Sequence, residues 1–394
     1  MNAIWLDIAR LLDRAVAGSF TGIDRVELAY AEHLLTLAPG RIRFVTLNRW
    51  SSRFSALPER RVRRFLADVR QAWSDGDISP CRAQALRLMS RSVFSRPPAD
   101  PAAVYLLVSH RHLHRQAALG SALRRSGAAF VPLIHDLIPL EFPEYGRPGE
   151  AARHRRRIAT VRQLANAAVV NSAATGAALA PYLPADRPVL VAPLGVEAMP
   201  RPAETPHNAR PYFLTVGTIE PRKNHLLLLH LWRRLIERHG DRAPRLMIIG
   251  RRGWENENVL DLLDRCEALR GHVTECGAVH DDTMARLMSS ARALLMPSFA
   301  EGFGLPVAEA LACQTPVLCS NLPALREAGG VVPEYLDPLD TPAWEAAIMD
   351  YAAEPSVRRT AQQARMPHWQ PTRWGPHVST VLDFALRQSN GRPT

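Results

Sequence analysis

Short apolar runs alternate with amphipathic segments through the second half of the chain. The apolar runs predict five strands, at residues 212–217, 245–250, 272–277, 293–298 and 316–320. Helical spacing of apolar positions fills the intervals between several of them, at residues 225–240, 259–271 and 281–292. Strands that are apolar throughout and are separated by amphipathic helices are typical of a parallel sheet with both faces covered. This half therefore predicts a doubly wound α/β domain.

The first half repeats this pattern less regularly. Its apolar runs predict strands at residues 3–9, 42–48, 103–109, 129–135 and 167–172. Its amphipathic segments predict helices at residues 23–37, 57–72, 82–94, 111–126 and 150–165. Residues 198–211 hold four prolines and no periodicity, which indicates a linker. We predict a first domain at 1–200, a second at 201–372, and a last helix at 373–394 that packs back toward the first domain.

Composition supports a soluble protein of two domains. The 394 residues exceed what one ordinary core accommodates, and 47% apolar with 22% charged residues is common for globular chains. No apolar run reaches the roughly 20 residues that a membrane-spanning helix needs. Asp7 and Asp13 interrupt the apolar opening segment, which therefore does not resemble a signal peptide. We expect a cytoplasmic protein.

The cysteine pattern agrees with that location. The five cysteines form no CxxC pair and have no histidine partners at zinc spacing; they are Cys81, Cys266, Cys276, Cys313 and Cys319. We expect reduced thiols and no metal site.

The net charge of +11 lies entirely in residues 1–200, since residues 201–394 are neutral. The densest basic runs are 59–70, 82–96 and 153–162. Two interpretations are open: solvated helix faces in an arginine-rich chain, or a basic surface for an anionic partner such as a membrane. A nucleic-acid-binding protein is a competing class, but the aromatic residues are not interleaved with the arginines and no known nucleic-acid motif occurs.

Two familiar phosphate-binding motifs are missing from the sequence. Neither GxGxxG nor GxxxxGK[ST] occurs, which argues against a dehydrogenase and against a P-loop NTPase. A nucleotide would have to be held in another way.

The segment GTIEPRKNH, residues 217–225, holds Lys223, the one lysine of the chain. Two explanations of this single lysine are open. It occurs by chance, or the position needs a compact ammonium that a guanidinium cannot replace. A strand ends at Gly217 and a helix begins near Asn224, a favourable N-cap residue. Arg222 and Lys223 thus lie beside a helix N-terminus, where backbone N–H groups and the helix dipole favour an anion.

A second loop follows the strand that ends near residue 297. Gly302 and Gly304 lie in it, and Pro306 suits the first turn of the next helix. That helix is apolar except at Glu309, so we expect it to be buried and its carboxylate to need a hydrogen-bonding partner such as ribose. Glu301 lies eight residues earlier, at the exposed mouth of the loop.

Together these segments resemble a known family. EGFGLPVAEAL is similar to the E-x7-E motif of retaining glycosyltransferases of the GT-B fold, family 4, and VGTIEPRKN resembles their phosphate-binding loop. TGIDRVELAYAEHL resembles the family's Gly-rich loop and helix, and IHDLIPLEFPEY resembles its HD segment. VVNSAATGAAL and APLGVE match later segments before the linker. The resemblance implies a GT-B fold: two Rossmann-like, doubly wound α/β domains that face each other across a cleft.

The resemblance also implies roles for single residues. Arg222 and Lys223, with Gly217, would bind the donor diphosphate and stabilise the leaving nucleotide, and Glu309 would hold the ribose. Donor-sugar hydroxyls would meet Glu301 and the backbone of Gly302, Phe303 and Gly304. In the first domain Gly22 would admit the diphosphate, His135 would face the reactive side of the sugar, and Asp136 would contact sugar or acceptor. Many members carry two glycines where this chain has Thr21-Gly22.

The predicted function is therefore a retaining hexosyltransferase of cell-surface polysaccharide assembly. The implied donor is a nucleoside-diphosphate sugar, with GDP-mannose favoured over UDP-sugars, and the acceptor is a glycan or a polyprenyl-diphosphate-linked oligosaccharide. Basic residues instead of an acidic metal-binding pair predict that no metal cofactor is needed. The basic first half suggests peripheral contact with the inner face of the cytoplasmic membrane. Another GT-B reaction, that of an epimerase or a phosphorylase, is the alternative.

Overall fold

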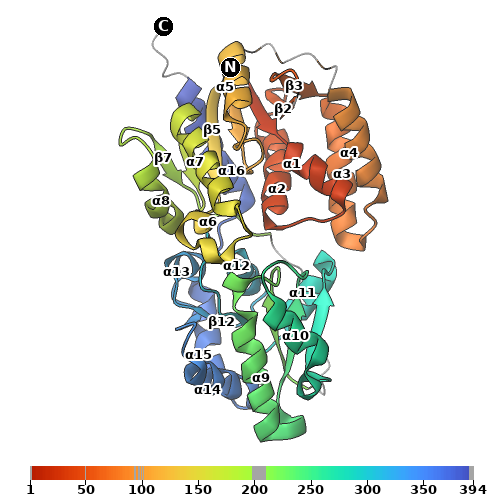
Figure 1. Cartoon of the computed structure of the whole chain (residues 1–394), viewed down its shortest axis with the longest axis vertical. Helices are drawn as coiled ribbons and strands as arrows, with labels where there is room; N and C mark the ends of the chain where they lie inside the picture. Colours follow the sequence, from red (N-terminus) through yellow and green to blue (C-terminus); the bar gives the residue numbers. More distant parts are fainter. Residues whose placement is uncertain are drawn as a thin grey trace. The chain divides into compact units, whose positions relative to one another are not determined.

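The computed structural model describes residues 2–48, 50–92, 95, 98, 100, 102–197 and 210–389. The chain, coloured along its sequence in Figure 1, divides into two compact units. The first comprises residues 1–140, 149–195 and 372–394, and the second comprises residues 141–148 and 196–371. Most of the predicted linker, up to residue 209, lies outside the described residues.

The first unit is built on a parallel sheet with one antiparallel edge. Within the described residues its seven strands follow the order β3-β2-β1-β4-β5-β6-β7, and only the β2–β3 pair is antiparallel. The strands are β1 (Ile4–Asp7), β2 (Ile42–Leu47), β3 (Phe54–Leu57), β4 (Val104–Leu107), β5 (Ala129–Ile134), β6 (Ala168–Val170) and β7 (Val189–Val191). All five strands predicted for this half are present. The edge strands β3 and β7 were not predicted.

Helices cover this sheet. They are α1 (Ala9–Ala17), α2 (Gly22–Leu37), α3 (Glu59–Asp75), α4 (Ser79–Ser92), α5 (Gln116–Ser126), α6 (Ile138–Glu141), α7 (Glu150–Leu164), α8 (Ala173–Leu179) and α16 (Trp374–Ser389). The helix predicted at 111–126 begins only at Gln116, and the helices α1, α6 and α8 were not predicted. His112 has a φ of 69°, a left-handed conformation that a continuous α-helix cannot contain.

The last helix, α16, belongs to the first unit and is drawn in blue among its red and yellow elements (Figure 1). The ring of His377 fixes it there, because Nδ1 donates to the carbonyl of Pro193 at 2.9 Å and Nε2 accepts from the Tyr30 hydroxyl at 2.8 Å. Gly195 permits the close approach, since a Cβ there would lie 2.5 Å from the backbone nitrogen of Trp374.

The second unit contains a sheet whose pairs are all parallel. In the described part of the chain its six strands follow the order β10-β9-β8-β11-β12-β13. They are β8 (Tyr212–Val216), β9 (Arg245–Ile249), β10 (Val273–Gly277), β11 (Leu294–Met296), β12 (Val317–Ser320) and β13 (Glu334–Leu336). The helices are α9 (His225–His239), α10 (Glu257–Arg265), α11 (Asp281–Ser290), α12 (Leu305–Ala312), α13 (Pro323–Gly329), α14 (Thr341–Ala352) and α15 (Val357–Arg365). Of these six strands, only the short β13 was not predicted from the sequence.

Large apolar side chains fill each core separately. Trp5, Phe54, Tyr105 and Phe130 form a chain of ring contacts in the first unit, with successive centroids 4.5–5.6 Å apart.

All five cysteines are described and none is paired. Among the helices that the structure describes, none is long and apolar enough to cross a bilayer.

Candidate functional site

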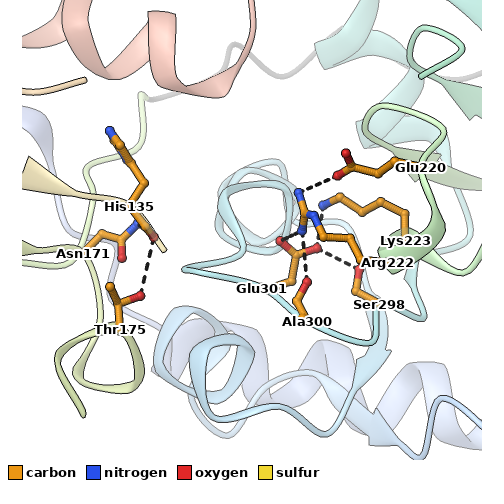
Figure 2. A network of polar contacts seen from close by, with 9 residues as sticks. All are labelled: His135, Asn171, Thr175, Glu220, Arg222, Lys223, Ser298, Ala300 and Glu301. Atoms are coloured by element: carbon orange, nitrogen blue, oxygen red, sulfur yellow. Dashed lines mark hydrogen bonds and ion pairs between the residues drawn. The ribbon is translucent and has the colours of Figure 1, made fainter. Parts of the chain in front are cut away.

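Arg222 and Lys223, two of the residues predicted to bind a diphosphate, lie in the second unit after the carboxyl end of β8 (Figure 2). A single turn of 3₁₀-helix, Pro221–Lys223, follows β8 and carries both cations. Lys223 Nζ lies 2.5 Å from Glu301 Oε1, and Arg222 Nη1 lies 2.8 Å from Glu301 Oε2. Two loops that are almost eighty residues apart in sequence are thus joined through one carboxylate.

The side chain of Glu301 is buried, although the residue as a whole is half-buried, so the expectation that it lies exposed at the mouth of the loop was wrong. Its side chain is 7% exposed, and Oε1 also accepts from the Ser298 hydroxyl at 2.8 Å. Burial alone would raise the pKa of this carboxyl, but Arg222, Lys223 and the hydrogen bonds lower the pKa to about 2. Glu301 is therefore ionised and serves as the counter-ion of both cations.

Lys223 occupies a confined position, since its side chain is 10% exposed. A Cβ at Gly217, whose φ is 144°, would lie 3.3 Å from Lys223 Cε, so the lysine stem runs directly over the glycine. Burial and the neighbouring Arg222 lower the pKa of Lys223, and Glu301 partly opposes this shift. A bulky planar guanidinium would fit this passage poorly, which favours a physical reason for the lysine over chance.

Arg222 is held from three sides. Its guanidinium donates to the carbonyl of Ala300 at 3.0 Å and pairs with Glu301 and, at 2.7 Å, with Glu220. Glu220 is buried, whereas the Arg222 side chain remains 23% exposed. The two cations and two carboxylates balance in charge, and the arrangement is pre-organised. Sequence reasoning missed Glu220 and Ser298, although both flank the predicted loops directly.

The glycine loop leads into α12 as predicted. Gly304 precedes the helix with a φ of 96°, and a Cβ there would lie 2.4 Å from Leu325 Cδ2, so both conformation and space require glycine. Pro306 lies in the first turn. The Phe303 side chain is buried, and Gly302 is half-buried. Glu309 is only half-buried, so the expectation of a buried carboxylate on this helix was wrong.

Helix α9 starts where the sequence suggested, but without the predicted side-chain cap. Asn224 adopts a left-handed conformation with φ 55°, and its side chain donates to the carbonyl of Pro338 at 3.0 Å. The next residue, His225, is buried, and neither ring nitrogen has a hydrogen-bond partner among the described residues. Burial and Lys223 lower the pKa of His225 to about 4, which keeps the ring neutral.

In the first unit, Gly22 is the first residue of α2, and no described atom lies within 4 Å of the position a Cβ would take. The turn before it is fixed by Asp24, whose Oδ2 accepts from the backbone N–H of Thr21 at 2.6 Å. Arg10 joins this turn through Asp24 at 2.7 Å and the Thr21 hydroxyl at 3.0 Å. Sequence reasoning missed both partners; the spacing Thr-x-x-Asp, which is typical of a capping box, was the available signal.

His135 lies directly after β5, and its ring is fixed in one tautomer. Nε2 lies 2.8 Å from the carbonyl oxygen of Val108; a carbonyl only accepts, so Nε2 carries the proton and donates. Nδ1 keeps its lone pair and takes part in no hydrogen bond within the described residues. Burial lowers the pKa of His135, so the ring is a neutral acceptor. Asp136 is half-buried beside it in sequence.

Within the described residues, no three histidine, cysteine, aspartate or glutamate side chains group closely enough to hold a metal ion. Metal independence remains a prediction.

Part of this chain is similar in sequence to known proteins. Residues 200–330 match the family model Glycosyl transferases group 1. O-antigen chain mannosyltransferase B of Escherichia coli is 37% identical over 164 residues, which cover 40% of this chain and 42% of the relative. O-antigen chain mannosyltransferase RfbU of Salmonella typhimurium is 32% identical over 149 residues, 37% of this chain and 40% of the relative. The chain thus spans less than half the length of these relatives. The predicted resemblance to group 1 glycosyltransferases is confirmed over residues 200–330.

Solved structures extend the likeness to both units. Sucrose-phosphate synthase from Thermosynechococcus elongatus superimposes with a TM-score of 0.66 at 15% identity, over 100% of each chain. Anabaena Alr3699/HepE, in complex with UDP and glucose, gives a TM-score of 0.64 at 13% identity, over 98% of this chain and 99% of the other. These structures confirm the predicted GT-B fold.

Proposed function

We propose that this chain, whose residues 200–330 form a glycosyl transferases group 1 domain, is a retaining mannosyltransferase of cell-surface polysaccharide assembly. Its donor would be GDP-mannose, and its acceptor a glycan or a lipid-linked oligosaccharide. The observation that carries the proposal is the pair Arg222–Lys223, locked by Glu301 at the carboxyl end of β8. The names of the two relatives described above, O-antigen chain mannosyltransferases of Escherichia coli and Salmonella typhimurium, support mannose as the sugar.

The two cations suit a leaving diphosphate. Breaking the anomeric bond places negative charge on the diphosphate, and fixed cations stabilise that charge without reorganising during the step. Glu301 prevents their side chains from moving, because each of its oxygens accepts from one cation. A carboxylate offers about four lone-pair sites, and three are used by Arg222, Lys223 and Ser298, which leaves Oε2 able to accept from a donor-sugar hydroxyl.

The residues of the first unit have complementary roles in the proposal. The neutral Nδ1 of His135 accepts a hydrogen bond, so it suits a sugar hydroxyl better than a phosphate oxygen, which cannot donate when ionised. Gly22, at the N-terminus of the 16-residue helix α2, leaves room for a phosphate to approach backbone N–H groups. Asp136 and Glu309 are assigned to the acceptor side and to the ribose.

A panel of nucleotides tests the donor. GDP should raise the melting temperature more than UDP does, and GDP-mannose should release GDP when a lipid-linked acceptor is added. The second candidate is a UDP-sugar transferase, favoured by the UDP complex of HepE; stabilisation by UDP alone would establish it. No response to either nucleotide would contradict a nucleotide-sugar enzyme.

We further propose that an arginine-rich surface of the first unit contacts anionic lipid. Arg60, Arg63 and Arg64 are exposed on α3. Arg82, Arg87 and Arg91 are exposed on α4, as is Leu86, which is 50% exposed. Each cation near an anionic membrane contributes about 1 kcal/mol. The protein should sediment with anionic liposomes at low salt and be released at high salt, and changing Arg60, Arg61, Arg63 and Arg64 to serine should abolish binding. Equal partition onto neutral liposomes would refute this surface.

A further inference from the structure

Side chains from two neighbouring loops hold the backbone of His135. Its N–H donates to His110 Nε2 at 3.3 Å, and its carbonyl accepts from Asn171 Nδ2 at 2.9 Å. Thr175 Oγ1 lies 3.5 Å from the same carbonyl (Figure 2). His110 follows β4 and Asn171 follows β6, so the two strands that flank β5 each contribute one group.

These side-chain hydrogen bonds replace strand pairing at the point where the sheet ends. Pairing of β5 with β6 ends at Ile134–Val170, and pairing with β4 ends at Leu107–Pro132. The N–H and C=O of His135 therefore lose their strand partners, and buried backbone groups without partners are costly. Water could satisfy them in an ordinary loop. Here the half-buried His110 and the buried Asn171 do so, which fixes the direction in which the imidazole leaves the strand.

The side chain of Asn171 satisfies a backbone group of His135 but is only partly satisfied itself among the described residues. Its side chain is buried, and its Nδ2 donates to His135, but its Oδ1 has no hydrogen-bond partner among the described residues. A buried amide that leaves its oxygen unsatisfied is destabilising compared with an apolar side chain of the same shape. Only the donated bond to His135 offsets that cost.

His110 is fixed as an acceptor. Its Nε2 receives the N–H of His135, and its ring packs edge-on against the rings of His135 and His154, with centroids 5.4 and 5.3 Å apart. Burial, His135 and His154 lower the pKa of His110 well below its ordinary value, so it stays neutral and can keep accepting.

We propose that His110 and Asn171 are positioning residues that act on the reaction only through His135, an inference that rests on the proposed function. Both hold the backbone from which the ring reaches Val108 and presents Nδ1. A shift of about 1 Å in such a group can reduce turnover a hundredfold. The residues are predicted to contribute to turnover and not to nucleotide affinity.

A double-mutant cycle tests this. Asn171→Leu, which keeps the shape and removes the donor, should lower kcat for GDP-mannose by about tenfold or more, with the dissociation constant for GDP unchanged. In a His135→Ala background the same change should alter kcat less than twofold. His110→Leu should behave likewise, and His110→Gln, whose Oε1 replaces Nε2 as acceptor, should restore most of the loss. Equal losses with and without His135 would overturn the inference.

A matched control and a second measurement separate this from stability and from the proposed function. Asn166 Oδ1 accepts from the N–H of Phe130 at 2.8 Å, at the other end of β5. Asn166→Leu should lower the melting temperature without lowering kcat. Nitrogen-15 spectra of labelled histidines need no substrate: wild type should show His135 as the Nε2–H tautomer, and Asn171→Leu should show mixed tautomers. An unchanged His135 signal in that variant would overturn the inference even if no donor sugar is turned over.

Discussion

Replacing Glu301 with glutamine should destabilise the free protein and yet tighten its binding of GDP. The carboxylate neutralises two cations, and these lower its pKa from 4.5 to about 2. That difference corresponds to about 3 kcal/mol of stability that the ionised group contributes. For a unit of this size each kcal/mol changes the melting temperature by about 2–4 °C, so Glu301→Gln should melt roughly 6–12 °C lower.

The pH dependence of this loss has a definite sign. The folded pKa is lower than the unfolded value, so the contribution is complete above pH 4.5 and is lost as the pH falls towards 2. The difference in unfolding free energy between wild type and Glu301→Gln should narrow over that range. Glu237→Gln is a suitable control: its pair with Arg233 is exposed, and it should change stability by less than about 1 kcal/mol.

The effect on nucleotide binding is opposite. Without Glu301, Lys223 and Arg222 keep their charge and lack one counter-ion, which a diphosphate can replace. Unit charges 4 Å apart interact by about 4 kcal/mol at an effective dielectric constant of 20. Half of that already exceeds the ~1.4 kcal/mol of a tenfold change, so calorimetry should find GDP bound about tenfold more tightly, while transfer from GDP-mannose falls. GDP bound more weakly by the variant would refute Glu301 as the counter-ion of both cations.

Four further predictions concern the same loops. Lys223→Ala should lower turnover, measured by GDP release, at least about tenfold with the fold intact. Lys223→Arg should also lose activity, because the side chain passes through a confined space over Gly217. Full activity of the arginine variant would mean that the single lysine of the chain occurs at this position by chance. Glu309→Gln should weaken GDP binding in calorimetry, and an unchanged affinity would remove Glu309 from the ribose site. Transfer should persist in EDTA, and abolition with rescue by magnesium would show that Arg222 and Lys223 do not suffice. The pKa of His225 is lowered from 6.5 to about 4, so up to about 3 kcal/mol of the unfolding free energy present above pH 6.5 should be lost as the pH falls towards 4. An acid-unfolding curve of His225→Phe that follows the wild-type curve would contradict this.

The strands of both sheets could be predicted because most are buried on both faces and so read as continuous apolar runs. Ile4–Asp7 and Ala129–Ile134 are buried at every position. The edge strand Val189–Val191 instead alternates in exposure and carries three residues, too few to register a period. Helix α1 was not predicted; it begins where the predicted strand 3–9 ends, and the carboxylate of Asp7 accepts from the N–H of Ala9 at this junction.

The loops of the site could be located from sequence, but the burial of their charges could not. Gly304 and Pro306 predict how the backbone turns into α12, because local conformation depends on local residue types. Whether Glu301 or Glu309 is the buried carboxylate depends on Arg222 and Lys223, which lie more than 75 residues away. A sequence periodicity contains no information about such a distant partner.

The position of α16 has a consequence for the order in which the molecule folds during synthesis. Residues 196–371 of the second unit lie ahead of α16 in the chain, so that unit has all of its sequence before the helix leaves the ribosome. The first unit must wait, since Tyr30 and His377 meet across 347 positions of sequence. The usual order, in which the domain made first folds first, is thereby reversed. Nascent first-unit chains would expose the face of α2 that packs against α16 until α16 has been synthesised.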